Sequence, residues 1–140
     1  MVKSRINSAL SEYASVSVTS GIEDATPHRL IQMLMEGALD KIATAKGHML
    51  HKNLSEKGRH ISWAISIISG LQSSLDMEAG GEVSANLDNL YDYMVRRLGL
   101  AGATDDAEIL DEISSLLLEV KSAWDVLPKQ LTGESRQAAS

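Results

Sequence analysis

Apolar residues recur with a period near 3.6 along almost the whole chain, and strand-like alternation never persists for long. The chain has no Phe, so Leu, Ile, Met, Val and Ala must supply the core. That composition suits helix-on-helix packing better than a β-sandwich. The sequence therefore predicts an all-α protein.

Helix-starting and helix-breaking residues divide the chain into five expected helices. A short helix over about 5–17 is followed by a stretch to residue 25 that contains Gly21 and loses periodicity. Thr26 and Pro27 form a strong helix start, because the hydroxyl can cap free amides and proline at the first position lacks a donor that would have had no partner. The helix that begins there is expected to run to about His51.

The three remaining helices follow the same logic. The third is expected to open at Asn53 or Ser55 and to end at the Gly80-Gly81 pair, and the fourth covers about 82–100 before a break over 101–104. The fifth is expected to open at a capping box and to stop before Pro128, and its box consists of Asp105 and Glu108. The expected buried stripes are Ile31, Leu34, Ala38, Ile42, Ala45 and Met49; Ile61, Ala64, Ile65, Ile68, Leu71 and Leu75; Val83, Leu87, Leu90, Tyr91, Met94 and Leu98; and Ile109, Ile113, Leu116, Leu117, Val120, Trp124 and Leu127.

Four long helices joined by short breaks predict an antiparallel up-and-down four-helix bundle with an additional short N-terminal helix. The expected division is 1–25 for the N-terminal helix and linker, 26–128 for the bundle, and 129–140 for a disordered tail. The N-terminal stripe of Ile6, Leu10 and Tyr13 is too short to be stable alone. We hypothesise that it covers part of a partner groove in the free protein.

Charge and composition exclude several classes of protein. The formal net charge is −6 and the pI is about 5.1, which gives phosphate no general attraction, so nucleic acid is not expected as a partner. No apolar run approaches the roughly 18–20 residues that span a bilayer, and no apolar run follows the basic start, so a cytoplasmic protein without membrane insertion is expected. The absence of Cys excludes disulfides and thiolate chemistry.

No pattern of catalytic residues is found, so no enzyme, cofactor or metal is expected. The Glu-x-x-His pairs of di-iron bundles are missing, and so are the usual hydrolase, nucleotide-binding and zinc-protease motifs. His48 and His51 could share one side of a helix, but two imidazoles without a third ligand make a poor metal site. Asp88 and Asp92 are read as part of a solvated face.

A second apolar face remains after the core stripes are assigned. Trp63 and Ile67 point well over 60° away from the inner stripe of the third helix, and Leu30, Met33 and Gly37 lie to one side of the second helix's stripe. These residues either pack against a neighbouring helix or form a groove for an amphipathic partner helix. Glycine inside a helix costs about 0.5–1 kcal/mol relative to alanine, so a close approach of a helix or a partner is expected at Gly37.

Two segments carry a resemblance to a known family. The stretch 74–98 (SLDMEAGGEVSANLDNLYDYMVRRL) and the stretch 26–38 (TPHRLIQMLMEGA) resemble the FliS-type flagellar export chaperones. Further matches are Lys57, Ile61, Ala64, Ile67, Ile68 and Trp124, whereas Met35 stands where the family usually has tyrosine.

The resemblance implies a chaperone that holds unpolymerised flagellin before export. Its expected partner is the C-terminal segment of flagellin, with the flagellar export gate as a further partner of the loaded chaperone; whether the free protein is a homodimer stays open. The candidate partner-binding residues are Tyr13, Leu30, Met33, Gly37, Trp63, Ile67, Tyr91 and Met94. The alternatives are a helical regulatory or adaptor protein of the flagellar system and, more distantly, a phosphotransfer bundle using His48 or His60.

Overall fold

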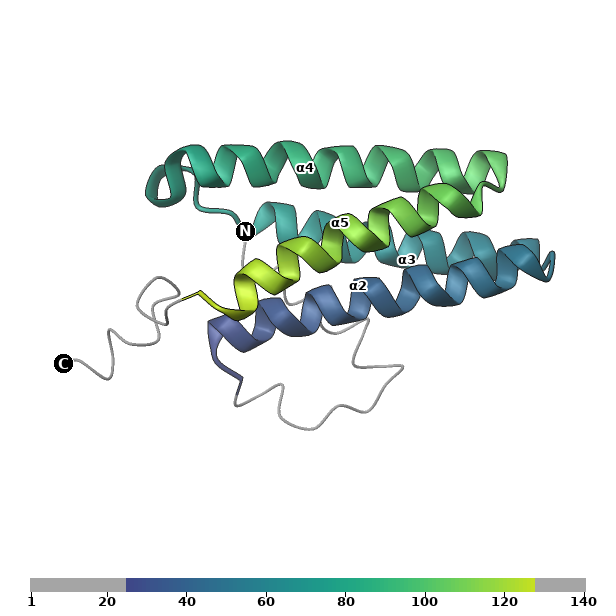
Figure 1. Cartoon of the computed structure of the whole chain (residues 1–140), viewed down its shortest axis with the longest axis horizontal. Helices are drawn as coiled ribbons and strands as arrows, with labels where there is room; N and C mark the ends of the chain where they lie inside the picture. Colours follow the sequence, from purple (N-terminus) through teal and green to yellow (C-terminus); the bar gives the residue numbers. More distant parts are fainter. Residues whose placement is uncertain (1–24, 128–140) are drawn as a thin grey trace.

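A computed structural model describes residues 25–127, which form four helices packed side by side (Figure 1). Successive helices are joined by short turns and run antiparallel. The predicted antiparallel four-helix bundle is confirmed, whereas the expected N-terminal helix and C-terminal tail lie outside the described residues. The helices are α2 (Pro27–Leu50), α3 (Leu54–Ser73), α4 (Met77–Thr104) and α5 (Ala107–Asp125).

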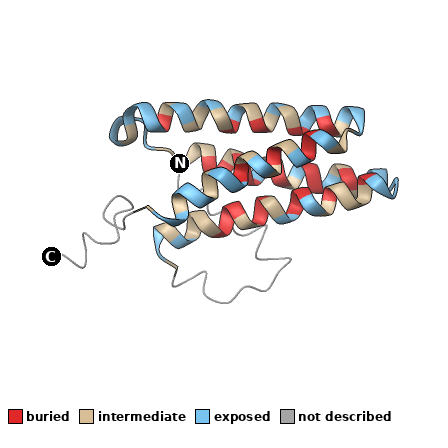
Figure 2. Ribbon diagram, viewed as in Figure 1, coloured by how far each residue is buried: buried red, intermediate tan, exposed pale blue. Residues whose placement is uncertain are grey.

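The bundle closes into a ring in the order α2, α3, α4, α5. Helix α2 packs on both α3 and α5, and α4 packs on the same two helices from the other side. Figure 2 shows the buried residues along the inward faces of the helices. Most of the predicted stripes are confirmed, and the largest fully buried side chains are Leu34, Met35, Ile42, Ile67, Ile68, Leu71, Met94, Leu98, Leu110, Ile113 and Leu117.

Polar side chains cap three of the four helix starts. The Thr26 hydroxyl accepts a hydrogen bond from the Arg29 backbone amide at 3.1 Å and Pro27 follows it, as predicted. The carboxylate of Asp76 accepts from two amides of α4, at 3.1 and 2.9 Å. Asp106 accepts from the Glu108 amide at 3.0 Å. These bonds satisfy donors that a helix start leaves without an intrahelical partner.

The break between the third and fourth helices differs from the prediction. Gly80-Gly81 does not end a helix: α3 ends at Ser73, and the Asp76 cap starts α4 before the glycines. Gly81 has φ 52° and ψ −125°, a backbone conformation that glycine adopts readily and other residues rarely do. This conformation kinks α4 but does not end the helix. After the kink, Ser84 is buried and Val83 is 68% exposed, so the expectation that Val83 lies in the core is wrong.

The break between the fourth and fifth helices is also later than predicted. Helix α4 continues through 101–104, where Ala101 packs into the core with 0% exposure; its last residue is Thr104, and Asp105 follows as the C-cap in the left-handed conformation. Asp tolerates that conformation better than most residues. Asp106, one residue after the expected position, caps α5.

Lys57, on α3, binds the C-terminal end of α4 at the break before α5. It is only 8% exposed, and its Nζ donates to the Gly102 carbonyl at 3.0 Å and to the Asp105 carboxylate. The ammonium thus satisfies a carbonyl at the α4 C-terminus that has lost its helical donor. Its positive charge also interacts favourably with the negative, C-terminal end of the α4 helix dipole.

We expect Lys57→Met to lower the free energy of unfolding by about 1–3 kcal/mol, since it leaves the Gly102 carbonyl without a donor. Urea denaturation followed by circular dichroism measures the change. The matched control is Lys46→Met, because Lys46 pairs with Asp111 at 2.8 Å but both side chains are exposed. The control is expected to cost less than about 1 kcal/mol. Equal losses in the two variants would contradict this account of Lys57.

The junction of α2 and α5 joins residues from opposite ends of the described chain. The Trp124 Nε1 donates to the His28 carbonyl at 3.0 Å, and the two rings stack with centroids 5.0 Å apart. Gln32 donates to Asp125 at 2.8 Å, and Lys121 donates to the same carboxylate at 2.8 Å. Lys121 and then Gln32 lower the pKa of the Asp125 carboxyl through these bonds.

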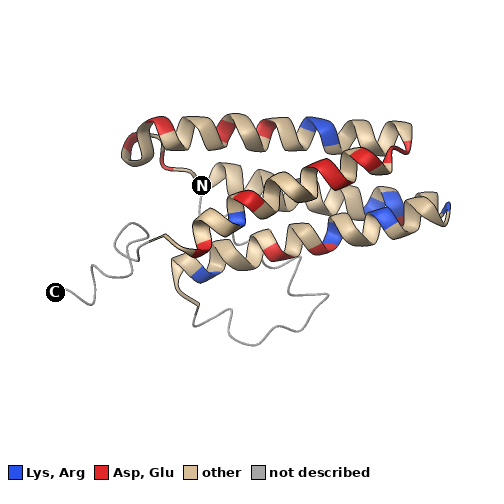
Figure 3. Ribbon diagram, viewed as in Figure 1, with Lys and Arg blue, Asp and Glu red and all other residues tan. Residues whose placement is uncertain are grey.

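Charged side chains are distributed over the outside of the bundle. Figure 3 shows acidic and basic residues interspersed along the helices. Exposed pairs such as Arg29 with Glu36 at 3.1 Å and Arg96 with Asp92 at 3.1 Å contribute little stability each. Within residues 25–127, no helix is both long and apolar enough to cross a membrane.

Candidate functional site

Most of the predicted partner-binding residues lie on α2 and α3. Leu30, Met33 and Gly37 follow one another at helical spacing on α2, and Trp63 and Ile67 do so on α3. The two helices are adjacent and antiparallel, so these residues run along one junction. We call this strip the α2–α3 seam; it comprises Leu30, Met33, Gly37, Lys41, Trp63 and Ile67.

The centre of the seam is a contact between Lys41 and Trp63. The Lys41 Nζ lies 4.0 Å from the centroid of the Trp63 ring, within the range of a cation–π interaction, although Lys41 itself is only 5% exposed. The Arg59 guanidinium approaches the same ring at 5.8 Å. Sequence reasoning did not include Lys41, because lysine is almost never fully buried and nothing in its neighbourhood signals the tryptophan across the junction.

Trp63 carries an unusual polar group. Its Nε1 is buried and has no hydrogen-bond partner in the described part of the chain. An indole nitrogen only donates, and buried donors in folded proteins are nearly always paired. By contrast, the second tryptophan, Trp124, donates to a carbonyl in the α2–α5 junction. Within residues 25–127, the seam therefore contains an unpaired, buried donor on a partly exposed aromatic ring.

Of the two alternatives for Ile67, the structure bears out packing against a neighbouring helix and not an exposed apolar side chain. Ile67 is 0% exposed and belongs to the main core cluster, and Met33 is 4% exposed. Helix α3 has α2 on one side and α4 on the other, so a side chain well away from its inner stripe is still covered. Of the seam's side chains, Leu30 and Trp63 keep intermediate exposure. A role for Ile67 in partner binding stays a prediction.

The two candidates on α4 lie inside the bundle. Tyr91 is 2% exposed and Met94 is 0% exposed, and burial raises the pKa of the Tyr91 phenol to about 12. Contact with a partner would require the helices to separate, so their role also stays a prediction. Tyr93, two residues along, is more exposed, and its hydroxyl donates to Glu112 at 2.5 Å. Tyr13 lies outside the described residues.

One group of side chains at the α2–α3 corner has the chemistry of a metal site. His48, Glu56 and His60 each offer a ligand atom, and the three atoms lie within 4.8 Å of one another. The sequence analysis considered only His48 with His51 and expected no metal site; in the structure the His51 Nδ1 lies 2.8 Å from the Gly47 carbonyl oxygen. His60 was missed as a partner because a turn and the start of another helix separate it from His48.

Comparison with known proteins points to one family. The sequence model of the family described as "Flagellar protein FliS" matches residues 9–131. The flagellar secretion chaperone FliSB of Pseudomonas aeruginosa is 51% identical over 117 residues, which cover 84% of this chain and 93% of the relative. The flagellar secretion chaperone FliS of Salmonella typhimurium is 42% identical over 131 residues, covering 92% and 97% of the two chains.

A third relative shows a similar identity. The flagellar secretion chaperone FliS of Vibrio cholerae is 40% identical over 122 residues, covering 87% of this chain and 90% of the relative. These relatives are named as chaperones, and no enzyme family is indicated. The resemblance seen in stretches 26–38 and 74–98 is therefore confirmed over most of the chain. This chain belongs to the FliS family of flagellar secretion chaperones.

Proposed function

We propose that this chain binds the C-terminal segment of flagellin in the cytoplasm, prevents its premature polymerisation and aids its delivery to the flagellar secretion apparatus. The family supports the class of function, and the α2–α3 seam supports a helix-binding mode. The observation that carries most weight is the partly exposed ring of Trp63, whose buried Nε1 has no hydrogen-bond partner in the described residues. Apolar side chains of a partner would cover the ring, and a carbonyl oxygen of the partner would satisfy the Nε1 once the indole turns outward.

The seam also has the composition of a surface for an amphipathic segment. Leu30 and Trp63 supply partly exposed apolar area, and the Lys41 ammonium beneath the ring fixes its position. Amphipathic helices dock through apolar residues at positions i, i+3, i+4 and i+7 into such junctions. A flagellin segment that folds as it binds would gain a large interface at a cost in ordering.

We expect a peptide covering the C-terminal region of the cognate flagellin to bind with a strongly negative heat-capacity change. Coupled folding and binding buries roughly 1,000–3,000 Å² of surface, and apolar burial lowers the heat capacity. Isothermal titration calorimetry at several temperatures measures it, and size-exclusion chromatography of the co-expressed proteins gives the stoichiometry. Binding to assembled filaments but not to the peptide would overturn the proposal.

A further inference from the structure

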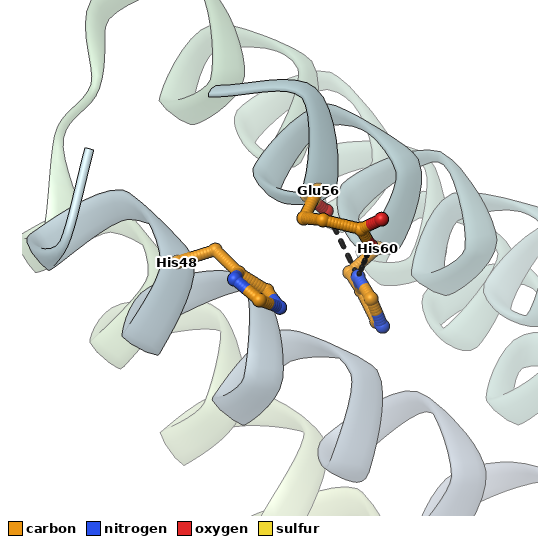
Figure 4. A group of neighbouring side chains, drawn as sticks. All are labelled: His48, Glu56 and His60. Carbon is orange, nitrogen blue, oxygen red and sulfur yellow. Dashed lines mark hydrogen bonds and ion pairs between the residues drawn. The ribbon is translucent and has the colours of Figure 1, made fainter. Parts of the chain in front are cut away.

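Two of the chain's four histidines meet at the corner where α2 passes into α3. His48 reaches from the last turns of α2 toward Glu56 and His60 on the first turns of α3 (Figure 4). The two imidazole rings lie 5.2 Å apart between centroids. The Glu56 carboxylate lies 3.6 Å from the His60 Nδ1. Three metal-ligating groups from two helices thus face one space.

The positions of His48 and His60 suit a cation that both imidazoles can reach. The His60 Nδ1 lies 2.8 Å from the Glu56 backbone carbonyl, to which it donates, so its Nε2 keeps a free lone pair. His60 is only 8% exposed, which limits its motion. A tetrahedral Zn²⁺ with bonds of about 2.0–2.1 Å holds its ligand atoms roughly 3.3 Å apart. The candidate ligand atoms lie within 4.8 Å of one another, and the Glu56 carboxylate, which is now near the His60 Nδ1, must rotate toward the Nε2 to complete the set.

The negative charge of Glu56 also favours a bound cation. Arg59 donates hydrogen bonds to the Glu56 carboxylate at 3.1 and 2.9 Å. Arg59 is exposed and can leave the carboxylate when a dication takes its place. Two imidazoles and one carboxylate form a ligand set that Zn²⁺ and similar transition metals accept, whereas Ca²⁺ and Mg²⁺ prefer oxygen ligands alone.

We propose that His48, Glu56 and His60 form a binding site for a divalent transition-metal ion of the Zn²⁺ type. The bound ion would link the C-terminal end of α2 to the start of α3 across the turn at 51–53. It would also lie close to the α2–α3 seam, because the His60 ring is 6.0 Å from the Trp63 ring. The site stands independently of the proposed binding of flagellin.

Zn²⁺ titration of the full chain without a polyhistidine tag tests the site. Calorimetry is expected to show one saturable Zn²⁺ per chain, and bound Co²⁺ is expected to show the visible absorption of a low-coordinate site. His48→Ala, Glu56→Gln and His60→Gln should each weaken Zn²⁺ binding by at least about tenfold, since loss of a ligand costs no less than loss of its supporting partner. Far-ultraviolet circular dichroism and the melting temperature without metal establish that each variant is folded.

His51→Ala is the matched control, because His51 is an exposed histidine one turn from His48 with its Nδ1 beside a backbone carbonyl. It is expected to bind Zn²⁺ as the parent does. The same concentration of Zn²⁺ should raise the melting temperature of the parent and of His51→Ala by several degrees and that of His48→Ala by clearly less. Absence of saturable binding, equal binding by all variants, or loss of binding in His51→Ala to the same extent as in His48→Ala would each overturn the proposal.

Discussion

Leu117→Asp is expected to leave the chain largely unfolded. Leu117 is 0% exposed on α5, at the centre of the bundle, where a carboxylate would have neither water nor a countercharge. An uncompensated buried charge costs about 3–5 kcal/mol, a large part of the roughly 5–15 kcal/mol that stabilises a typical domain. Urea denaturation followed by circular dichroism should show a lost or strongly shifted transition.

The neighbouring residue provides the control. Leu118 is 54% exposed, so Leu118→Asp is expected to change the free energy of unfolding by less than about 0.5 kcal/mol. Ile67→Asp tests whether Ile67 belongs to the core. Because Ile67 is 0% exposed, this substitution should lower the free energy of unfolding as severely as Leu117→Asp does. If Ile67→Asp instead unfolds like Leu118→Asp, the burial of Ile67 described above is wrong.

Trp63→Ala is expected to weaken binding of the flagellin C-terminal peptide by at least about 30-fold. A partly exposed tryptophan at the centre of an apolar junction has the character of a binding hot spot, whose truncation costs about 2 kcal/mol or more. Trp63→Phe keeps an aromatic ring near Lys41 but lacks the Nε1 donor. It should lose about five- to tenfold, the value of one hydrogen bond to a buried donor. Calorimetric titration measures both.

Trp124→Ala is the control that tests whether the loss of peptide binding is specific to Trp63 or follows from removing any tryptophan. Trp124 is the only other tryptophan, it is likewise of intermediate exposure, and its Nε1 is already paired with the His28 carbonyl. It is expected to retain peptide binding within a few-fold once the melting temperature shows that the variant is folded. Similar losses in Trp63→Ala and Trp124→Ala would place the partner surface elsewhere than the α2–α3 seam.

The parts of the fold that depend on local chemistry were predictable from sequence. Thr26 and Pro27 start α2 where expected, and the 3.6-residue period gave the right class and most of the buried residues. The glycine pair was misread because a strong cap at Asp76 precedes it. A glycine with positive φ then bends a helix that has already begun.

Features that depend on neighbours in space were not predictable. A helical wheel gives the direction of Ile67 but not the number of helices that flank α3, so burial on a second side could not be derived. Lys57 reaches the end of α4, and its partner Asp105 is 48 positions away. Part of the seam was predictable, because Leu30, Met33 and Gly37 share one face of α2. The contact between Lys41 and Trp63 was not, because it depends on how α2 and α3 are aligned along their lengths.

The ring order of the helices has a consequence for the folding kinetics. Three of its four junctions join consecutive helices, but the α2–α5 junction pairs residues 93 and 96 positions apart, as in Gln32 with Asp125 and Trp124 with His28. Contacts between distant residues require closure of a longer loop and form late. We therefore expect the hairpins to assemble first and the α2–α5 junction to close the ring, so that stabilising this junction slows unfolding more than it speeds folding.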